Sequence, residues 1–312
     1  MQIALRNGVS VRARSRVGFR HGHVRIARRS CRALAPGSQP VGAEDTMATE
    51  STRKFAVITG ASSGIGFELT KQCLAHDHDV MICAEDAGIV AAASKLAGAG
   101  GTVQAVRADL ATREGVEQLY QAIVDTHRPV DALLLNAGVG VGGAFVDTSL
   151  EDEMNMILLN CCHTVHLAKR VIPDLVARGK GHVLITGSVV STSPNPYQAV
   201  YGATKAFVMS FGEAIRHELA NTGVTVTVLQ PGATDTGFFE RAHLMNTKVG
   251  QAKKDDPALV AKNGFDAMID GKDSVLAGSF KSKVEGLMNE ILPETFKAAQ
   301  AGKTTKPLTD KH

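Results

Sequence analysis

Short runs of apolar, often β-branched residues alternate with longer helical stretches from Phe55 onward. This alternation is typical of a parallel sheet with helices on both faces. The predicted strands lie near residues 55–59, 79–84, 102–107, 131–135, 181–187, 223–229 and 273–278. The predicted helices lie near residues 64–77, 87–98, 112–126, 151–177 and 199–221. The pattern predicts an α/β fold with a doubly wound parallel sheet in a single domain, residues 47–280.

The first 46 residues depart from this pattern. They hold nine Arg, no Lys and two acids, a net charge of +7, whereas the whole 312-residue chain carries +3. They show no steady apolar period, so we predict a disordered basic extension. Three interpretations remain open: a misassigned start, a mitochondrial targeting peptide and an arm that binds nucleic acid. A start at Met47 is favoured, because a short polar stretch leads from it directly into the first strand, and no nucleic-acid partner is then expected.

Residues 281–312 form a second extension, beyond the last predicted strand. Apolar residues recur there at helical spacing: Val284, Leu287, Met288, Ile291 and Leu292. The spacing predicts an amphipathic helix followed by a tail. Such a helix could cover a substrate mouth, join a subunit contact or rest on a membrane surface.

Composition narrows the class of protein. The hydrophobic fraction of 44% is ordinary for a globular domain. No run of 18 apolar residues occurs, so we expect no transmembrane segment. The five cysteines are an odd number in a long chain, which favours reduced thiols and a cytoplasmic protein.

A cluster of possible metal ligands stands out on one predicted helix. His163 and His166 lie three residues apart, beside Cys161 and Cys162. Zinc sites usually draw their ligands from more than one segment, and the sequence offers no second Cys/His pair at suitable spacing. We therefore predict no metal site.

The first strand ends in a glycine-rich turn, Thr59-Gly60-Ala61-Ser62-Ser63-Gly64-Ile65-Gly66, and a predicted helix follows. Glycines let the backbone turn tightly and approach a pyrophosphate, and the helix N-terminus favours the anion. The strand, turn and helix together predict a dinucleotide-binding site.

Acid–base chemistry is indicated by Tyr201 and Lys205, four residues apart on one helix face. A cation at roughly 4 Å lowers the pKa of a phenol from about 10 by roughly three units. Such a tyrosine can exchange a proton with an alcohol near neutral pH. Ser188, thirteen residues upstream, can donate a hydrogen bond to the same substrate oxygen.

These motifs, in this order, resemble those of the short-chain dehydrogenase/reductase family in its compact form, over about residues 53–240. Asn136-Ala137-Gly138 and Pro231-Gly232 match two further family motifs. The resemblance implies a Rossmann fold and an NAD(P)-dependent oxidoreductase that interconverts a secondary alcohol and a ketone. It implies four catalytic residues: Asn160, Ser188, Tyr201 and Lys205.

The resemblance also implies a cofactor-binding set. Asp109 would contact the adenine, Asn136 would steady the sheet, and Asn160 would mark a helix distortion that holds a water against Lys205. Thr234 and Thr236 would hold the nicotinamide carboxamide. The whole set comprises Gly60, Ser62, Ser63, Gly64, Ile65, Gly66, Glu85, Asp109, Leu110, Asn136, Ala137, Gly138, Tyr201, Lys205, Pro231, Gly232, Thr234 and Thr236.

Cofactor choice depends on the residues after the second strand. In the family an acidic residue there binds the ribose hydroxyls of NAD, and a basic one holds the 2′-phosphate of NADP. This chain has Glu85, which would repel that phosphate, so NAD is favoured over NADP. The match is offset by one residue, because Ala84 occupies the usual position of the NAD aspartate.

The segments that vary most within the family indicate the class of substrate and the oligomeric state. Residues 235–270 would form the substrate lid, and Phe238, Phe239, Leu244 and Met245 there favour an apolar carbonyl or alcohol. The charged run at 253–256 would be a solvated turn. A homo-oligomer is expected, with a dimer through residues 151–177 and 199–221 favoured, where Phe207 and Phe211 would lie in the core or at the interface.

A different class of function remains as the alternative, namely a non-catalytic dinucleotide-sensing or scaffold protein with the same fold. The intact set of Asn160, Ser188, Tyr201 and Lys205 argues against it, because a sensor has no need for acid–base residues.

Overall fold

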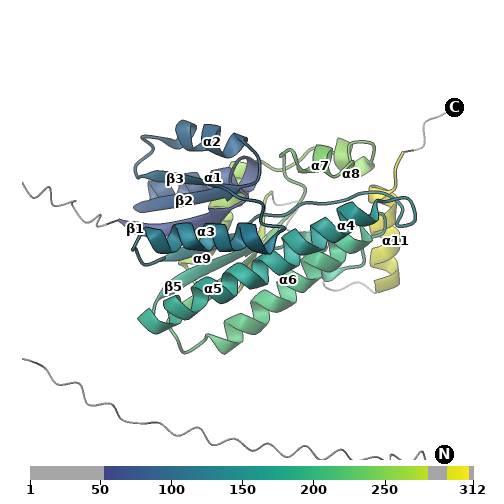
Figure 1. Cartoon of the computed structure of the whole chain (residues 1–312). Helices are drawn as coiled ribbons and strands as arrows, with labels where there is room; N and C mark the ends of the chain where they lie inside the picture. The colour runs from purple at the N-terminus through teal and green to yellow at the C-terminus, as the bar shows by residue number, and fades with distance from the viewer. Residues whose placement is uncertain (1–52, 280–293, 309–312) are drawn as a thin grey trace, which may run out of the picture. The chain divides into compact units, whose positions relative to one another are not determined.

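The computed structural model describes residues 53–279 and 294–308, in which seven strands form one wholly parallel sheet (Figure 1). The strands are β1 (Lys54–Thr59), β2 (His78–Ala84), β3 (Val103–Arg107), β4 (Ala132–Leu135), β5 (Gly181–Thr186), β6 (Val224–Pro231) and β7 (Ser274–Ala277). Their order in the sheet is β3-β2-β1-β4-β5-β6-β7. The order reverses between β1 and β4, so the predicted doubly wound Rossmann fold is confirmed.

Helices cover both faces of this sheet. They are α1 (Gly64–Ala75), α2 (Gly88–Leu96), α3 (Arg113–Asp125), α4 (Leu150–Ile157), α5 (His163–Arg178), α6 (Ala199–Glu218), α7 (Phe238–Arg241), α8 (Lys248–Gln251), α9 (Pro257–Ile269) and α11 (Glu294–Thr305). In Figure 1, α3, α5 and α6 lie in front of the sheet. The side chains of α1, α2 and α9 pack on the opposite face.

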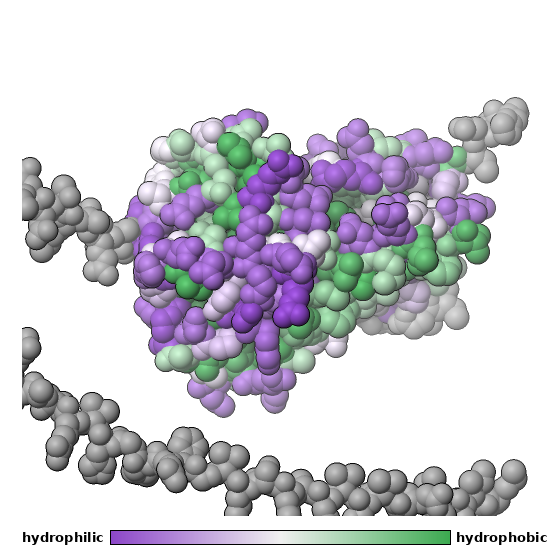
Figure 2. Space-filling model, in the orientation of Figure 1, coloured by the Kyte–Doolittle hydropathy of each residue, from purple (hydrophilic) through white to green (hydrophobic). Residues whose placement is uncertain are grey.

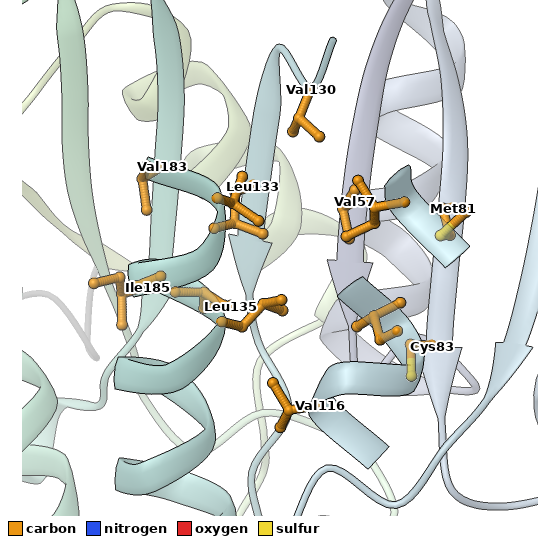
Figure 3. Packing of buried hydrophobic residues seen from close by; sticks show 14 of the residues in the cluster. Val57, Met81, Cys83, Val116, Val130, Leu133, Leu135, Val183 and Ile185 are labelled. Atoms are coloured by element: carbon orange, nitrogen blue, oxygen red, sulfur yellow. The ribbon is translucent and has the colours of Figure 1, made fainter. Parts of the chain in front are cut away.

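Alternation along each strand divides the core into two layers. Phe55 and Val57 of β1 pack toward α3, α5 and α6, whereas Ala56 and Ile58 pack toward α1, α2 and α9. Successive side chains of a strand point to opposite faces, and here both faces are buried. Figure 3 shows part of the first layer, to which neighbouring strands contribute Val57, Leu133 and Ile185, and α3 contributes Val116.

One predicted element was wrong. Residues 257–269 do not belong to a substrate lid, because they form α9, which packs on α1 and buries Val260, Phe265 and Met268 in the core. Asp256 caps this helix by accepting a hydrogen bond from Ala258 N at 2.9 Å, and Pro257 occupies its first turn.

The two chain extensions are described only in part. Residues 1–52 and 280–293 lie outside the described residues, so the basic extension and most of the predicted C-terminal amphipathic helix stay predictions. The contacts within residues 51–312 group that stretch into one unit. Among the described helices, none combines the length and the apolar composition that crossing a membrane requires.

Candidate active site

A cavity of about 1440 Å³ lies at the carboxyl ends of the strands, where ligands bind in open parallel sheets. Residues that follow five of the strands line it: Gly60, Glu85, Asn136, Ser188 and Gly232. The sheet therefore collects at one edge most of the residues singled out in the sequence.

The glycine-rich turn has the geometry of a close backbone cradle. Gly60 has a φ of 66°, which favours glycine, and a Cβ added at Gly66 would lie 2.2 Å from the Gly60 carbonyl oxygen. Asn136 Nδ2 donates to the carbonyls of Thr59 and Gly60, at 3.1 Å each. Its Oδ1 accepts from Thr186 Oγ1 at 3.1 Å, so Asn136 joins the ends of β1, β4 and β5.

The cavity fits a dinucleotide. Its volume is ample for one, and the first-turn amides of α1 have no partner within the helix. Among the described residues, the side chain of the N-cap Ser63 bonds none of those amides either. They face the same cavity as the glycine-rich turn, which is the arrangement that binds a pyrophosphate.

Tyr201 and Ser188 meet at the centre of the cavity wall. Both side chains are buried, and a hydrogen bond joins them. Burial raises the pKa of Tyr201 to about 12, although the bond with Ser188 lowers it in part. Tyr201 is therefore a neutral phenol near pH 7, able to donate a proton.

Lys205 does not act on Tyr201 in the way predicted. Its Nζ lies 5.8 Å from the centre of the Tyr201 ring and donates a hydrogen bond to the Thr186 carbonyl at 2.9 Å. Burial lowers the pKa of Lys205 itself to about 8. The expected lowering of the tyrosine pKa is wrong here, because the loss of solvent around the phenol outweighs a cation directed at another oxygen.

Asn160 lies behind the cavity wall, in a π-helical turn, Leu158–Cys162, between α4 and α5. The predicted helix at 151–177 is thus continuous but distorted at Asn160, as the resemblance implied. Gly138 lies against both Asn160 and Lys205: a Cβ there would be 3.1 Å from Asn160 Oδ1 and 3.4 Å from Lys205 Nζ. These three residues are therefore neighbours, which the sequence alone did not establish.

Two carboxylates that follow β2, Glu85 and Asp86, line the cavity. Sequence reasoning chose Glu85 and missed Asp86, whose Oδ2 accepts from Ser62 Oγ at 2.7 Å and so braces the glycine-rich turn. Arg107 Nε donates to the Glu85 carbonyl at 2.8 Å.

Most of the predicted cofactor-binding set lines the cavity, with one exception. Asp109 is exposed and lies outside the lining, because its Oδ1 accepts from Ala111 N at 2.9 Å in a local turn. The neighbours Ala108 and Leu110 line the cavity in its place.

The side of the cavity next to Tyr201, where a substrate would bind, is formed by segments whose positions the sequence predicted less accurately. Phe238 lines the cavity with its ring centre 5.2 Å from that of Tyr201, and Phe239 lines it beside Phe238. Leu244 is buried beneath them and Met245 is exposed, so these two residues do not line the cavity as predicted. Helix α11 contributes a further wall, through Lys297, Gln300, Ala301, Thr304 and Thr305.

The charged run before α9 is also part of this wall. Lys253, Lys254 and Asp255 line the cavity, and Asp255 forms an isolated β-bridge with Thr234, three residues beyond β6. Lys254 Nζ donates to the Gly250 carbonyl at 2.6 Å. The predicted solvated turn is thus confirmed at the exposed residues Lys253 and Asp256, whereas Lys254 and Asp255 are half-buried.

His163 and His166 each contact another group of the chain. His163 is buried with Nδ1 3.0 Å from the Leu159 carbonyl, and burial lowers its pKa to about 4. His166 Nε2 lies 2.6 Å from Glu117 Oε1. Across residues 53–279 and 294–308, no three His, Cys, Asp or Glu side chains gather as metal ligands would.

The sequence profile of a known family, described as short chain dehydrogenase, matches residues 54–246. The chain belongs to the short-chain dehydrogenase family. It is an NAD(P)-dependent oxidoreductase.

Relatives and solved structures agree with this assignment. An uncharacterized oxidoreductase of Staphylococcus epidermidis is 30% identical over 216 residues, which cover 69% of this chain and 89% of the relative. A short-chain dehydrogenase from Sphingobium yanoikuyae in complex with NADPH is 27% identical with a TM-score of 0.66, covering 77% of this chain and 96% of that one. A 3-ketoacyl-(acyl-carrier-protein) reductase from Brucella melitensis complexed with NADH is 26% identical with a TM-score of 0.62, covering 69% and 90%.

Proposed function

We propose that this oxidoreductase interconverts a secondary alcohol and a ketone on an apolar small molecule. The observation that carries the proposal is the contact between Ser188 and Tyr201, both buried in one wall of a cavity that fits a dinucleotide. The reaction needs a hydrogen-bond donor and a proton donor at one substrate oxygen, and these two hydroxyls supply both.

Each residue has a role that its surroundings support. Ser188 orients the substrate oxygen, and the neutral phenol of Tyr201 gives that oxygen a proton when a ketone is reduced. Lys205, with a pKa lowered to about 8, is held near its point of titration and can return a proton toward Tyr201. Asn160 is a positioning residue, because it lies behind the wall rather than in it. Hydride exchange is the chemistry that a bound nicotinamide supplies.

The cofactor proposed is NAD rather than NADP. Glu85 and Asp86 both line the cavity where β2 ends, and two carboxylates repel a 2′-phosphate. The solved relatives bind NADPH in one case and NADH in another, so the choice rests on the residues of this chain.

The apolar body of the substrate would rest on Phe238 and Phe239, and Val139, Val189 and Val190 add further apolar lining. Aromatic side chains beside the acid–base residues favour an apolar group next to the reacting carbon. One solved relative is named for reduction of a 3-ketoacyl group, a ketone on an aliphatic chain.

A homodimer is proposed through α4, α5 and α6. Large apolar side chains are exposed on these helices and on the π-helical turn between α4 and α5: Leu150, Met154, Leu158, Val165 and Phe207. Figure 2 shows hydrophobic surface over α4 and α6 in the same view. A contiguous apolar face of this kind marks a protein interface. The proposed location is the cytoplasm, on the ground of thiols such as Cys73 and Cys161, which are free.

A turnover screen tests the proposal. The full chain is mixed with NADH or NADPH and a panel of aryl, cyclic and alkyl ketones, and with NAD or NADP and the matching alcohols, while nicotinamide absorbance is followed. We expect turnover of at least one ketone–alcohol pair. Tight cofactor binding with no turnover across the panel would instead support the sensor function.

A further inference from the structure

Two buried amide side chains line the cavity close to the acid–base residues. Asn195 and Gln198 are each 6% exposed, and both belong to the cavity lining. Gln198 is the N-cap of α6, three residues before Tyr201, and residues three apart on a helix have Cβ atoms about 5–6 Å apart. A Cβ added at Gly202 would lie 2.8 Å from Asn195 Cβ, so Asn195 packs on the first turn of the same helix. The two amides are therefore neighbours of Tyr201.

The chain before α6 is held in a conformation that is unusual for its residue types. Tyr197 has a φ of 62°, a left-handed conformation that a bulky residue rarely adopts. Gly143 N donates a hydrogen bond to the Tyr197 carbonyl at 2.9 Å. On the other side, Thr305 Oγ1 of α11 donates to the Pro196 carbonyl at 2.7 Å. The loop after β4 and helix α11 thus fix the backbone of residues 195–198, and with it the positions of the two amides.

Both amides keep unused hydrogen-bonding groups. Asn195 Nδ2 donates to Gln198 Oε1 at 3.3 Å, and among the described residues no other group bonds either side chain. The Gln198 side chain does not cap α6. Two amides joined by one bond retain one free oxygen and one free NH2 group, whichever way each amide faces. Neither free group is fully enclosed by protein, so both are open to the cavity that the two residues line.

We propose that the substrate carries a hydroxyl group a few bonds from the reacting carbon, and that Asn195 and Gln198 bind this hydroxyl. A hydroxyl donates and accepts, so it bonds the free oxygen and the free NH2 together, whereas an ether or a second carbonyl bonds only the NH2. Polar groups in a buried wall are normally hydrogen-bonded, which favours a ligand that satisfies both.

The proposal rests on the oxidoreductase function proposed above and names its substrate class, a hydroxy ketone and the corresponding diol. Reduction adds a hydride and a proton to the ketone at Ser188 and Tyr201. The hydroxyl held by Asn195 and Gln198 is unchanged by the reaction, so the amide pair selects and orients the substrate and is not part of the proton transfer.

The test compares phenyl ketones that differ in one group, with the full-chain protein saturated with NAD, so that the ketone is not reduced. Each ω-hydroxyalkyl phenyl ketone, over a series of chain lengths, is compared with its methyl ether and with the parent alkyl phenyl ketone. Dissociation constants come from calorimetry, and kcat/KM with NADH is measured separately. Gln198→Met and Asn195→Leu each remove one amide and nearly keep the size of the side chain. Gln251→Met, exposed on α8 and outside the lining, is the control.

We expect one chain length at which the wild type binds the hydroxy ketone about 10-fold more tightly than the parent ketone, with the methyl ether between them. Gln198→Met and Asn195→Leu should each reduce this preference about threefold or more, because each removes one of the two hydrogen bonds. The affinities for the parent ketone and for NAD should stay unchanged. Gln251→Met should keep the full preference.

Equal binding of hydroxy ketone and parent ketone by the wild type at every chain length would overturn the proposal. Equal weakening of all three kinds of probe by both variants would also overturn it, since that is the result of a purely structural role. Turnover of parent ketones without any preference for the hydroxyl would leave the proposed reaction standing and overturn the amide site. Hydroxyl-dependent binding without turnover would contradict the proposed reaction and leave the amide site standing.

Discussion

The side-chain amide of Asn160 bonds both backbone groups of Val139: Oδ1 accepts from the amide nitrogen at 3.0 Å, and Nδ2 donates to the carbonyl at 3.0 Å. Nδ2 also donates to Thr204 Oγ1 at 2.9 Å, one residue before Lys205. Val139 lines the cavity and Thr204 belongs to α6. One amide therefore fixes the distance between the cavity wall after β4 and the helix that carries Tyr201 and Lys205.

Replacement of this amide should disturb both stability and turnover. Asn160→Asp keeps the shape but places a carboxylate oxygen against the Val139 carbonyl, so unfolding free energy should fall by about 1–3 kcal/mol. kcat should fall at least about 10-fold, since Lys205 loses its position. Chemical denaturation and steady-state kinetics measure the two effects. Asn155→Asp, exposed on α4, is the control, and an unchanged kcat would contradict a positioning role for Asn160.

Burial of Lys205 predicts a pH dependence of stability in the cofactor-free protein. Its pKa is lowered from 10.5 to about 8, so between these values the unfolded chain binds more protons than the folded one. The unfolding free energy is therefore highest above pH 10.5, where Lys205 is neutral in both states, and it falls as the pH falls toward 8. The unfolding free energy of the wild type, measured relative to Lys205→Met, should therefore rise by on the order of 3 kcal/mol from pH 8 to 10.5. Urea titrations of both proteins test this, and a difference independent of pH would refute it.

Cofactor choice should respond to one substitution. Glu85→Arg replaces a repulsive charge with one that attracts a 2′-phosphate, so kcat/KM for NADPH relative to NADH should rise by about five- to 150-fold. Glu114→Arg, exposed on α3 and outside the lining, should leave the ratio unchanged. A wild type that prefers NADPH, or a variant that gains nothing for it, would remove Glu85 as the discriminating residue.

The proposed dimer should depend on Phe207, which is 43% exposed and stacks on Phe211 with ring centres 6.2 Å apart. A charge introduced into a buried apolar interface is costly, so Phe207→Asp should shift the protein to monomers in sedimentation experiments. Val90→Asp, 60% exposed on α2, should leave the mass unchanged. A monomeric wild type would sink the proposal.

The layered fold and the acid–base cluster could be predicted because their signals are local. Apolar runs predicted the strands, and the four-residue spacing of Tyr201 and Lys205 gave them one helix face. The start of α9 was equally readable, since Asp256 and Pro257 are ordinary helix-start residues, but the family comparison assigned that stretch to a lid.

Other contacts have no local signal. Lys297 bonds a carbonyl 105 residues earlier in the chain, and only the folded chain brings these two segments together. Asp86 faces the glycine-rich turn because its Oδ1 accepts from Gly88 N at 2.8 Å, a turn geometry that the sequence left open beside Glu85. The pKa of Tyr201 likewise depends on burial, which spacing alone does not give.

The most direct measurement of the central claim is kcat for Tyr201→Phe, with the dissociation constant of NADH measured on the same sample. The variant removes only the hydroxyl that gives the substrate its proton, so kcat should fall by about 10²–10⁴-fold while NADH affinity stays near that of the wild type. Tyr120→Phe, on α3 and outside the lining, should keep full activity. A Tyr201→Phe enzyme that retains most of its turnover would contradict the account.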